Sequence, residues 1–338
     1  MYSTYISKDD SNAIKGIAIL LMLFYHLFNR VTDGMVDVWV GGQPLTKFLS
    51  GGAYPVPFFL MMSGYGLYYT KEKGRLNLGS TCKRSLKLYI HYWLVLLIFA
   101  GIGCFVAPEF YPGDAAKVIE NVTAWHCTYN YETWFLLPYV VLSLLAPLIF
   151  RAMDKIPIKW SLLMALVISY GAQFVVSRYV ATGALTQSVL VFVIVVAGLL
   201  FDFVIGAAMA KYAFAHQRED GGENQHPVSL SLGIILLVVL FLLRCVVRLP
   251  WDAFYTFLLI FVFLNMKRIG WIEGILRALG KKSMVMWMVH TYFSIYLFHG
   301  FIYGFKYPIL IYMVLIAISY GVATILEIVC KPIAKRIR

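Results

Sequence analysis

The first long apolar stretch of the chain carries two ionisable side chains, Lys15 and His26. They are eleven residues apart, which in an α-helix is three turns plus about 20°, so both lie on one face with about 16 Å of helix between them. Lysine supplies a positive charge, and histidine accepts and returns a proton near neutral pH. The pair predicts a helix with a cation at one end and an acid-base group toward the other. A simpler interpretation stays open, in which Lys15 reaches lipid headgroups and His26 bonds to a neighbouring carbonyl.

Three other residues have types that could serve a site. His290 lies in a stretch with few polar neighbours, and it either faces a cavity or makes an interhelical hydrogen bond. Trp134 either lines a cavity or belongs to the aromatic belt at a membrane interface. Ser63 could be read as a nucleophile, but the pair Ser63-Gly64 more often permits close packing of helices. For each of these three residues, the surrounding sequence does not choose between the two interpretations.

The remaining buried charges and the cysteines are predicted to be structural. Asp202, Arg244 and Glu327 lie within apolar stretches, and we expect each to have a partner inside the bundle because exposure to lipid would cost several kcal/mol. The five cysteines lack the spacing of metal ligands, so no metal site is predicted, and only Cys104 and Cys127 could meet across one loop.

The composition identifies the environment of these residues. Hydrophobic side chains make up 61% of the 338 residues and charged ones 14%, with a mean hydropathy of +0.76. A water-soluble core cannot hide that much apolar surface, so lipid must be the solvent. Apolar stretches lie near 13 to 29, 54 to 70, 87 to 107, 133 to 150, 160 to 178, 188 to 211, 229 to 247, 252 to 267, 283 to 301 and 308 to 330. The sequence therefore predicts an all-α polytopic transmembrane bundle of about ten helices, forming one domain over residues 1–338 without a soluble domain.

The net charge is +12, and the basic residues lie in short clusters beside the apolar stretches and do not form a basic face on a soluble domain. If the N terminus is cytoplasmic, 22 of the 29 Lys and Arg residues fall on the cytoplasmic side of a ten-helix arrangement. Positive charge that flanks membrane helices stays in the cytoplasm. We therefore expect a multi-pass protein of the cell membrane with both termini cytoplasmic and with no nucleic-acid partner.

Six short motifs occur in an order that is typical of one family. They are Lys15 to His26, Pro57 to Tyr65, Lys83 to Lys87, Trp134 to Leu136, Phe203 to Gly206, and Leu279 to Ser283 followed by Trp287 to His290. Together they resemble acyltransferase family 3, the integral membrane acyltransferases, over nearly the whole chain. Two positions depart from the pattern, because Lys15 stands where most members have Arg and Lys87 replaces the second Arg of an Arg-x-x-Arg element. Both keep the charge but lose the bidentate geometry of a guanidinium.

The resemblance implies an acyl-CoA, expected to be acetyl-CoA, as a cosubstrate that binds from the cytoplasm, with no tightly bound cofactor. The spacing of about 16 Å between Lys15 and His26 suits an extended pantetheine arm. Such an arm would hold its phosphates near the inner face and its thioester deep in the bundle. Lys15, Arg84 and Lys87 are expected to neutralise the nucleotide phosphates. Ordinary positive-inside anchoring would explain the same three residues.

The resemblance also implies that His26 is the base for acyl transfer to an acceptor on the far side of the membrane. It would take the proton of an attacking hydroxyl, although a covalent acyl-histidine route stays open. We expect the acceptor to be a cell-surface carbohydrate or a related envelope compound. Trp134, His290 and Asp33 are candidates for contacts with it. Asp33 follows His26 by seven residues and could orient the imidazole, but no spacing rule selects it over the other acidic residues of the outer side, Asp37, Asp114, Glu120 and Glu132.

Two other classes of function compete with this interpretation. A secondary transporter or exporter of a small polar solute would use intramembrane charges as a path, but it predicts helices interrupted by Gly or Pro in matching halves, and the sequence shows none. A non-enzymatic partner or sensor subunit would need neither His26 nor a basic entrance. The expected partners are thus the acyl-CoA donor, the hydroxyl acceptor and the lipid bilayer.

Overall fold

The computed structural model describes residues 5–30, 34–186, 188–216, 227–247 and 250–335. Within them, helices dominate, and the strands β1 (Trp39–Val40) and β2 (Gln43–Pro44) form one short antiparallel pair. The long helices are α1 (Lys8–Phe28), α3 (Val56–Glu72), α4 (Leu78–Val106), α6 (Leu136–Lys155), α7 (Ile158–Val175), α8 (Val189–Gly198), α9 (Leu200–His216), α10 (Leu230–Val246), α11 (Asp252–Asn265), α12 (Gly270–Thr291) and α14 (Pro308–Lys335). The short ones are α2 (Leu45–Ser50), α5 (Ala115–Thr123), η1 (Tyr131–Thr133), η2 (Val176–Val180), η3 (Tyr292–Tyr296) and α13 (His299–Tyr303).

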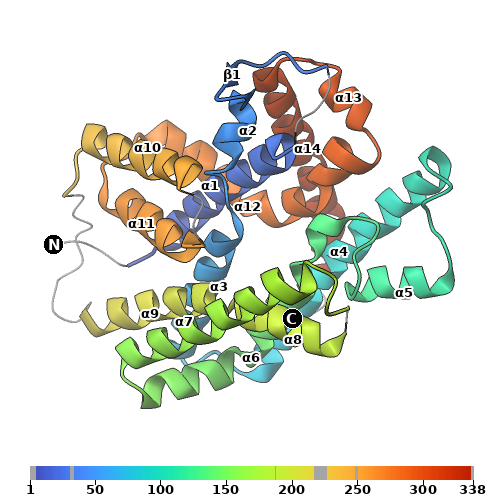
Figure 1. Cartoon of the computed structure of the whole chain (residues 1–338). Helices are drawn as coiled ribbons and strands as arrows, with labels where there is room; N and C mark the ends of the chain where they lie inside the picture. Colours follow the sequence, from blue (N-terminus) through green and yellow to red (C-terminus); the bar gives the residue numbers. More distant parts are fainter. Residues whose placement is uncertain (1–4, 31–33, 187, 217–226, 248–249, 336–338) are drawn as a thin grey trace.

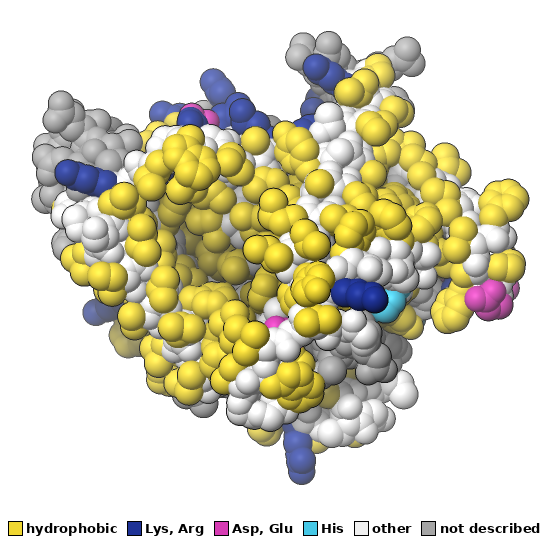
Figure 2. All heavy atoms as spheres, turned by 90° about the horizontal axis from the view of Figure 1, so that it is seen from above, with side chains coloured by type: hydrophobic (Ala, Val, Ile, Leu, Met, Phe, Trp, Pro, Cys, Tyr) yellow, Lys and Arg dark blue, Asp and Glu magenta, His cyan; other side chains and the backbone are white. Residues whose placement is uncertain are grey.

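The prediction of an all-helical membrane protein is confirmed, but the number of ten spans is not. Helices cover most of each predicted apolar stretch, although 188–211 and 283–301 are each divided between elements. Six helical segments of the described chain are both long and apolar enough to cross a membrane. Helices α10 and α11 are apolar but shorter, and α3 has 17 residues. Large hydrophobic side chains on the outside, such as Leu97 and Phe105, are typical of a lipid-facing surface. Figure 2 shows one such face, covered mostly by hydrophobic side chains.

Helix α1 begins at Lys8, five residues before the predicted apolar stretch, because a capping box sets its start. The Ser7 side chain accepts a hydrogen bond from the backbone N–H of Asp10, and the Asp10 carboxylate accepts one from the backbone N–H of Ser7. Arg268 contacts the same carboxylate at 2.5 Å, and Arg277 contacts Asp9 at 2.9 Å. These contacts fix the N-terminal end of α1 to the start of α12.

Helices α1 and α12 run parallel near the centre of the bundle and touch backbone to backbone (Figure 1). A Cβ atom added at Gly16 would collide with the carbonyl group of Leu276, and one added at Gly280 would collide with the carbonyl group of Asn12. Small residues allow this kind of close approach in membranes. Gly16 and Gly280 are 264 positions apart in sequence, and two residues with that same separation meet again farther along the pair, at the site described below.

A second parallel pair, α3 and α9, uses the same device. Gly64 lies against the carbonyl group of Phe203, and Gly206 lies against that of Met61. The neighbouring Ser63 is buried and donates a hydrogen bond to the Tyr139 hydroxyl at 3.2 Å. The Ser63-Gly64 motif therefore serves helix packing, as the sequence indicates.

The predicted single stretch at 188 to 211 is broken in the structure at Leu199, between α8 and α9. Side chains of α7 satisfy the backbone groups that the break releases. The Ser169 hydroxyl donates to the carbonyl oxygen of Ala197 and accepts from the N–H of Phe201, and the Gln173 amide donates to the carbonyl oxygen of Gly198. A break inside a membrane helix is tolerated where neighbours supply such bonds.

Replacing Gly280 with alanine is expected to lower the free energy of unfolding by about 2 kcal/mol, because the new methyl group meets fixed backbone of α1. Gly274→Ala on the same helix is the matched control, since nothing lies within 4 Å of its added Cβ. Denaturant titration of both variants in detergent measures the difference. Equal stability of the two variants would contradict close packing at Gly280.

Candidate active site

The two histidines that the sequence singled out meet where α1 and α12 lie side by side. His26 Nδ1 and His290 Nε2 are 2.8 Å apart, and the ring planes are inclined by only 27°. His290 is fully buried, whereas His26 is partly accessible. The separation of 264 residues is the one found at the glycine pair, so the close approach of Gly16 and Gly280 sets the register that brings the two imidazoles together.

Hydrogen-bond partners decide which ring nitrogens carry protons. His290 Nδ1 lies 2.8 Å from the backbone carbonyl oxygen of Trp287 and 3.2 Å from that of Met286. A carbonyl oxygen only accepts, so Nδ1 of His290 carries a proton and Nε2 of the neutral ring accepts one. The proton between the two rings then belongs to His26 Nδ1. His26 Nε2 is left with its lone pair, which is the state that an acid-base catalyst needs to take up a proton.

The segment before α6 holds α12 next to this pair. The Asn130 amide donates to the carbonyl oxygen of Met288 at 3.1 Å and its oxygen accepts from the Thr291 hydroxyl at 2.8 Å. The Trp287 indole donates to the carbonyl oxygen of Glu132 at 3.0 Å. These buried bonds flank His290 on both sides and restrict movement of the backbone that carries it.

A cavity of about 230 Å³ lies between α3, α4, α6 and α12, and we call it the basic cavity. Arg84, Lys87 and His91 of α4 line it, and their spacing places them on one helix face. Met284 lines it from α12, six residues or about 9 Å of helix before His290. Within the described part of the chain, neither Arg84 nor Lys87 forms an ion pair with a carboxylate.

Lys15 lies within electrostatic range of Arg84, and it too has no carboxylate partner among the described residues. The three predicted cations therefore gather at the end of α1 where the helix begins. Uncompensated positive charges close together repel one another, and a polyanion would relieve that repulsion.

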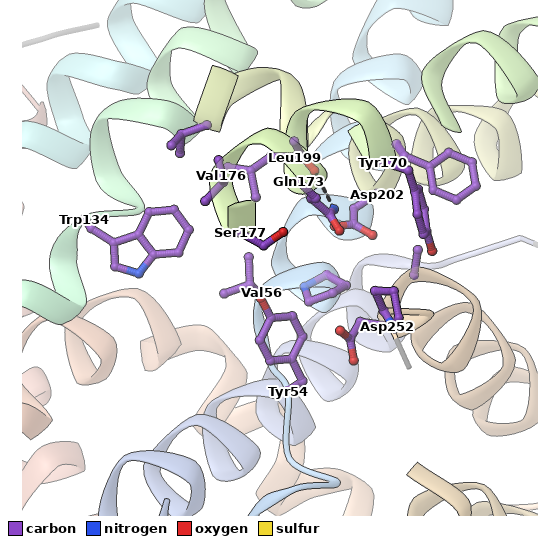
Figure 3. Close-up of a pocket in the computed structure, with 16 residues that line it drawn as sticks. Tyr54, Val56, Trp134, Tyr170, Gln173, Val176, Ser177, Leu199, Asp202 and Asp252 are labelled. Atoms are coloured by element: carbon purple, nitrogen blue, oxygen red, sulfur yellow. Dashed lines mark hydrogen bonds between the residues drawn. The ribbon is translucent and has the colours of Figure 1, made fainter. Parts of the chain in front are cut away.

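A second cavity of about 400 Å³ lies between the starts of α3, α6 and α11, the end of α7 and the break between α8 and α9. We call it the acidic cavity because Asp202 and Asp252 line it (Figure 3). Trp134 lines it as well, and so does Tyr54, which lies within electrostatic reach of Tyr25, the residue before His26. A third cavity, between α7, α9 and α11, is almost entirely hydrophobic and offers little to a polar ligand.

The family comparison fits this arrangement of helices and motifs. A family model described as an acyltransferase domain, that of acyltransferase family 3, matches residues 9–328. The chain belongs to acyltransferase family 3. It is therefore a membrane protein that transfers acyl groups, and the resemblance found in the sequence is confirmed. No curated protein and no solved structure matches the chain.

The predicted site residues of this family 3 acyltransferase fall into separate places. His26 and His290 are bonded to each other, Arg84 and Lys87 share the basic cavity with Lys15 nearby, and Trp134 lies at the acidic cavity. Asp33 lies outside the described residues, so its suggested role stays a prediction.

Among the buried charges, Arg244 pairs with Asp252 at 2.6 Å and Glu327 pairs with Lys282 at 2.8 Å, as expected. For Asp202, the described residues supply no hydrogen bond or ion pair although it is only 8% exposed, so its expected partner stays a prediction. Its position in the first turn of α9 offsets part of the cost, because the positive end of the helix dipole favours a carboxylate there.

Sequence reasoning missed several residues that line the two cavities. His91 follows Arg84 by seven residues and Lys87 by four, a helical spacing that would have placed it on the same face. Tyr170 and Asp252 carry no such signal, because only the packing of α7 and α11 around the helix break brings them to Asp202.

Proposed function

We propose that this family 3 protein is a membrane O-acyltransferase that moves an acyl group, expected to be acetyl, from acyl-CoA to a hydroxyl of a cell-surface carbohydrate or related envelope acceptor. The observation that carries the proposal is the chain of bonds from the Trp287 carbonyl through His290 to His26, which leaves His26 Nε2 free to accept a proton. Imidazole is the side chain best suited to move a proton near neutral pH.

The proposed reaction needs one proton shuttle. The acceptor oxygen attacks the thioester carbonyl carbon while His26 Nε2 takes the hydroxyl proton. The tetrahedral intermediate then collapses, the carbon–sulfur bond breaks, and His26 returns the proton to the leaving thiolate. The products are an ester and free CoA. Proton transfer by a positioned group of this kind contributes about 10²- to 10⁴-fold to a rate.

The donor is proposed to enter through the basic cavity. Its volume of about 230 Å³ suits the narrow pantetheine arm, while the exposed Arg84 and neighbouring Lys87 and Lys15 offer positive charge to the nucleotide phosphates outside it. We place this end of the bundle in the cytoplasm, with about ten spans and both termini inside. The skew of positive charge in the sequence supports that orientation.

Replacing Arg84 with alanine is expected to raise the KM for acetyl-CoA about fivefold with little change in kcat, because an exposed charge contributes up to about 1 kcal/mol. The effect should shrink at high salt and for acetyl-dephospho-CoA, which lacks a phosphate. Lys83→Ala is the matched control, since Lys83 is exposed on the same helix turn but does not line the basic cavity. Equal KM values for both variants would remove Arg84 from donor binding.

The function itself is tested with purified protein in nanodiscs and acetyl-CoA labelled in the acetyl group. We expect label to move from CoA to envelope glycans, and mass spectrometry of glycans from cells with and without the gene should identify the ester. A transporter would carry its solute across the membrane and leave acetyl-CoA intact. Intact acetyl-CoA in the presence of glycans from the native envelope would contradict the proposal.

A further inference from the structure

The acidic cavity contains two polar groups that lack partners among the described residues. The carboxylate of Asp202 is more than nine-tenths buried and lies at the helix break, where it points into the cavity in Figure 3. The hydroxyl oxygen of Tyr170 is buried and has no hydrogen-bond partner in the described chain. A buried polar group without a partner costs free energy, so a cavity lined by both of these residues indicates that a polar ligand binds there.

The other walls fit a polyhydroxylated ring. The aromatic rings of Tyr54 and Trp134 both line the cavity, Trp134 at the left and Tyr54 at the bottom of Figure 3, and each is partly exposed. Their flat apolar faces can cover the C–H face of a sugar, while polar tips remain for hydrogen bonds. The side-chain amide nitrogen of Gln173 donates a hydrogen bond to the carbonyl oxygen of Gly198, and the side-chain oxygen of Gln173 can act as a further acceptor.

Among the described residues, the charges that line the acidic cavity are not balanced. Asp252 is paired with Arg244 at 2.6 Å, whereas Asp202 has no described cation beside it. The two carboxylates lie close enough to interact electrostatically. Burying a further negative charge in this partly desolvated space beside two carboxyl groups would be unfavourable, whereas hydroxyl groups can form hydrogen bonds with Asp202 without that cost.

We infer that the acidic cavity is the acceptor site and that it selects an uncharged saccharide unit over an anionic one. Hydroxyl groups of the sugar donate to Asp202, the Tyr170 hydroxyl bonds to a ring substituent, and Tyr54 and Trp134 hold the ring. Tyr54 lies within electrostatic reach of Tyr25, and the ring of Tyr25 lies 5.3 Å from that of His26 between centroids, so the cavity is on the His26 side of the bundle. The link to transfer rests on the proposed function, but binding of the sugar does not.

The test is therefore equilibrium binding without acyl-CoA. The protein in nanodiscs is titrated calorimetrically with the neutral methyl glycosides of glucose, mannose and galactose, and with the methyl glycosides of the three corresponding uronic acids. At least one neutral glycoside is expected to bind at least tenfold more tightly than its uronate. Asp202→Asn should weaken binding of the neutral glycoside and reduce its preference over the uronate. Tyr170→Phe should weaken binding of the neutral glycoside about fivefold.

Two matched controls accompany these variants. Glu109→Gln removes a carboxylate charge from an exposed turn, and Tyr179→Phe removes a hydroxyl from the exposed face of the segment after α7. Both should bind the neutral glycoside as the unmodified protein does. No binding of any neutral glycoside, equal or tighter binding of the uronates, or unchanged binding by both Asp202→Asn and Tyr170→Phe would overturn the inference.

The outcomes also separate this inference from the proposed function. Sugar binding without acetyl transfer in a parallel assay would support the acidic cavity and reject the proposed reaction. Transfer to envelope glycans by a protein whose Asp202→Asn and Tyr170→Phe variants keep their acceptor KM would support the reaction and reject this cavity as the acceptor site.

Discussion

The variant His26→Ala is expected to lower kcat for acyl transfer about 10²- to 10⁴-fold. The variant lacks the imidazole that His290 orients and whose Nε2 is proposed to take the hydroxyl proton. The KM for acetyl-CoA should change little, since the cations lie near the other end of α1. Rates are measured with labelled acetyl-CoA at saturating donor and acceptor.

A folded control is essential, because His26 also helps to join α1 to α12. His299→Ala removes an exposed histidine that stacks on Tyr303 and should keep the full rate. Acid quench during turnover distinguishes the two roles left open for His26, since a covalent route would leave label on the protein. A folded His26→Ala protein that transfers at the unmodified rate would remove His26 from the reaction.

The second large effect is expected at His290, which acts through His26. Its Nε2 accepts the Nδ1 proton of His26 and so holds the ring in the tautomer with a free Nε2. His290→Leu removes that acceptor and should lower kcat about 10²- to 10³-fold without raising the KM for acetyl-CoA. Misorienting a base by loss of its hydrogen-bonded partner has effects of this order or larger in other enzymes.

Rescue separates positioning from general stability at this buried residue. His290→Gln offers a carbonyl oxygen near the place of Nε2 and should recover part of the lost kcat. Thr291→Val is the matched control, because it removes a buried hydrogen bond to Asn130 one residue away and leaves His26 untouched. Equal kcat values for His290→Gln and His290→Leu would mean that His290 has a structural role only. A kcat of Thr291→Val as low as that of His290→Leu would mean the same.

Much of the arrangement around His26 follows from sequence patterns. Helical spacing alone places Lys15 and His26 on one face, and the family motifs include the second histidine. The start of α1 is harder to predict, because Lys8 to Asp10 are polar and lie outside any apolar stretch, and its capping box has Asp10 where the usual motif has Glu or Gln.

The pairing of His26 with His290 could not be predicted, because it depends on contacts between residues far apart in sequence. Gly16 and Gly280 set the register of α1 against α12, and neither glycine reveals its partner by spacing. The structure gives His290 an interhelical hydrogen bond to His26, which was one of its two interpretations, and contact of His290 with the acceptor stays a prediction.

The acidic cavity was missed for a related reason. Apolar residues continue without interruption through Leu199, so the stretch reads as one helix. The break depends on Ser169 and Gln173 of α7, which supply bonds that the sequence of the stretch itself does not contain. The position of Asp202 at this cavity, without an ion pair to any described residue, also appears only once α7 and α11 are in place.

The central claim is that His26 takes the acceptor proton beside a separately bound donor. Single-turnover transfer tests it most directly, with the unmodified protein and His26→Ala each loaded to saturation with labelled acetyl-CoA and then mixed with envelope glycan. We predict that both proteins bind the donor equally and that only the unmodified protein moves label to the glycan within its turnover time. Equal transfer by the two loaded proteins would contradict the claim.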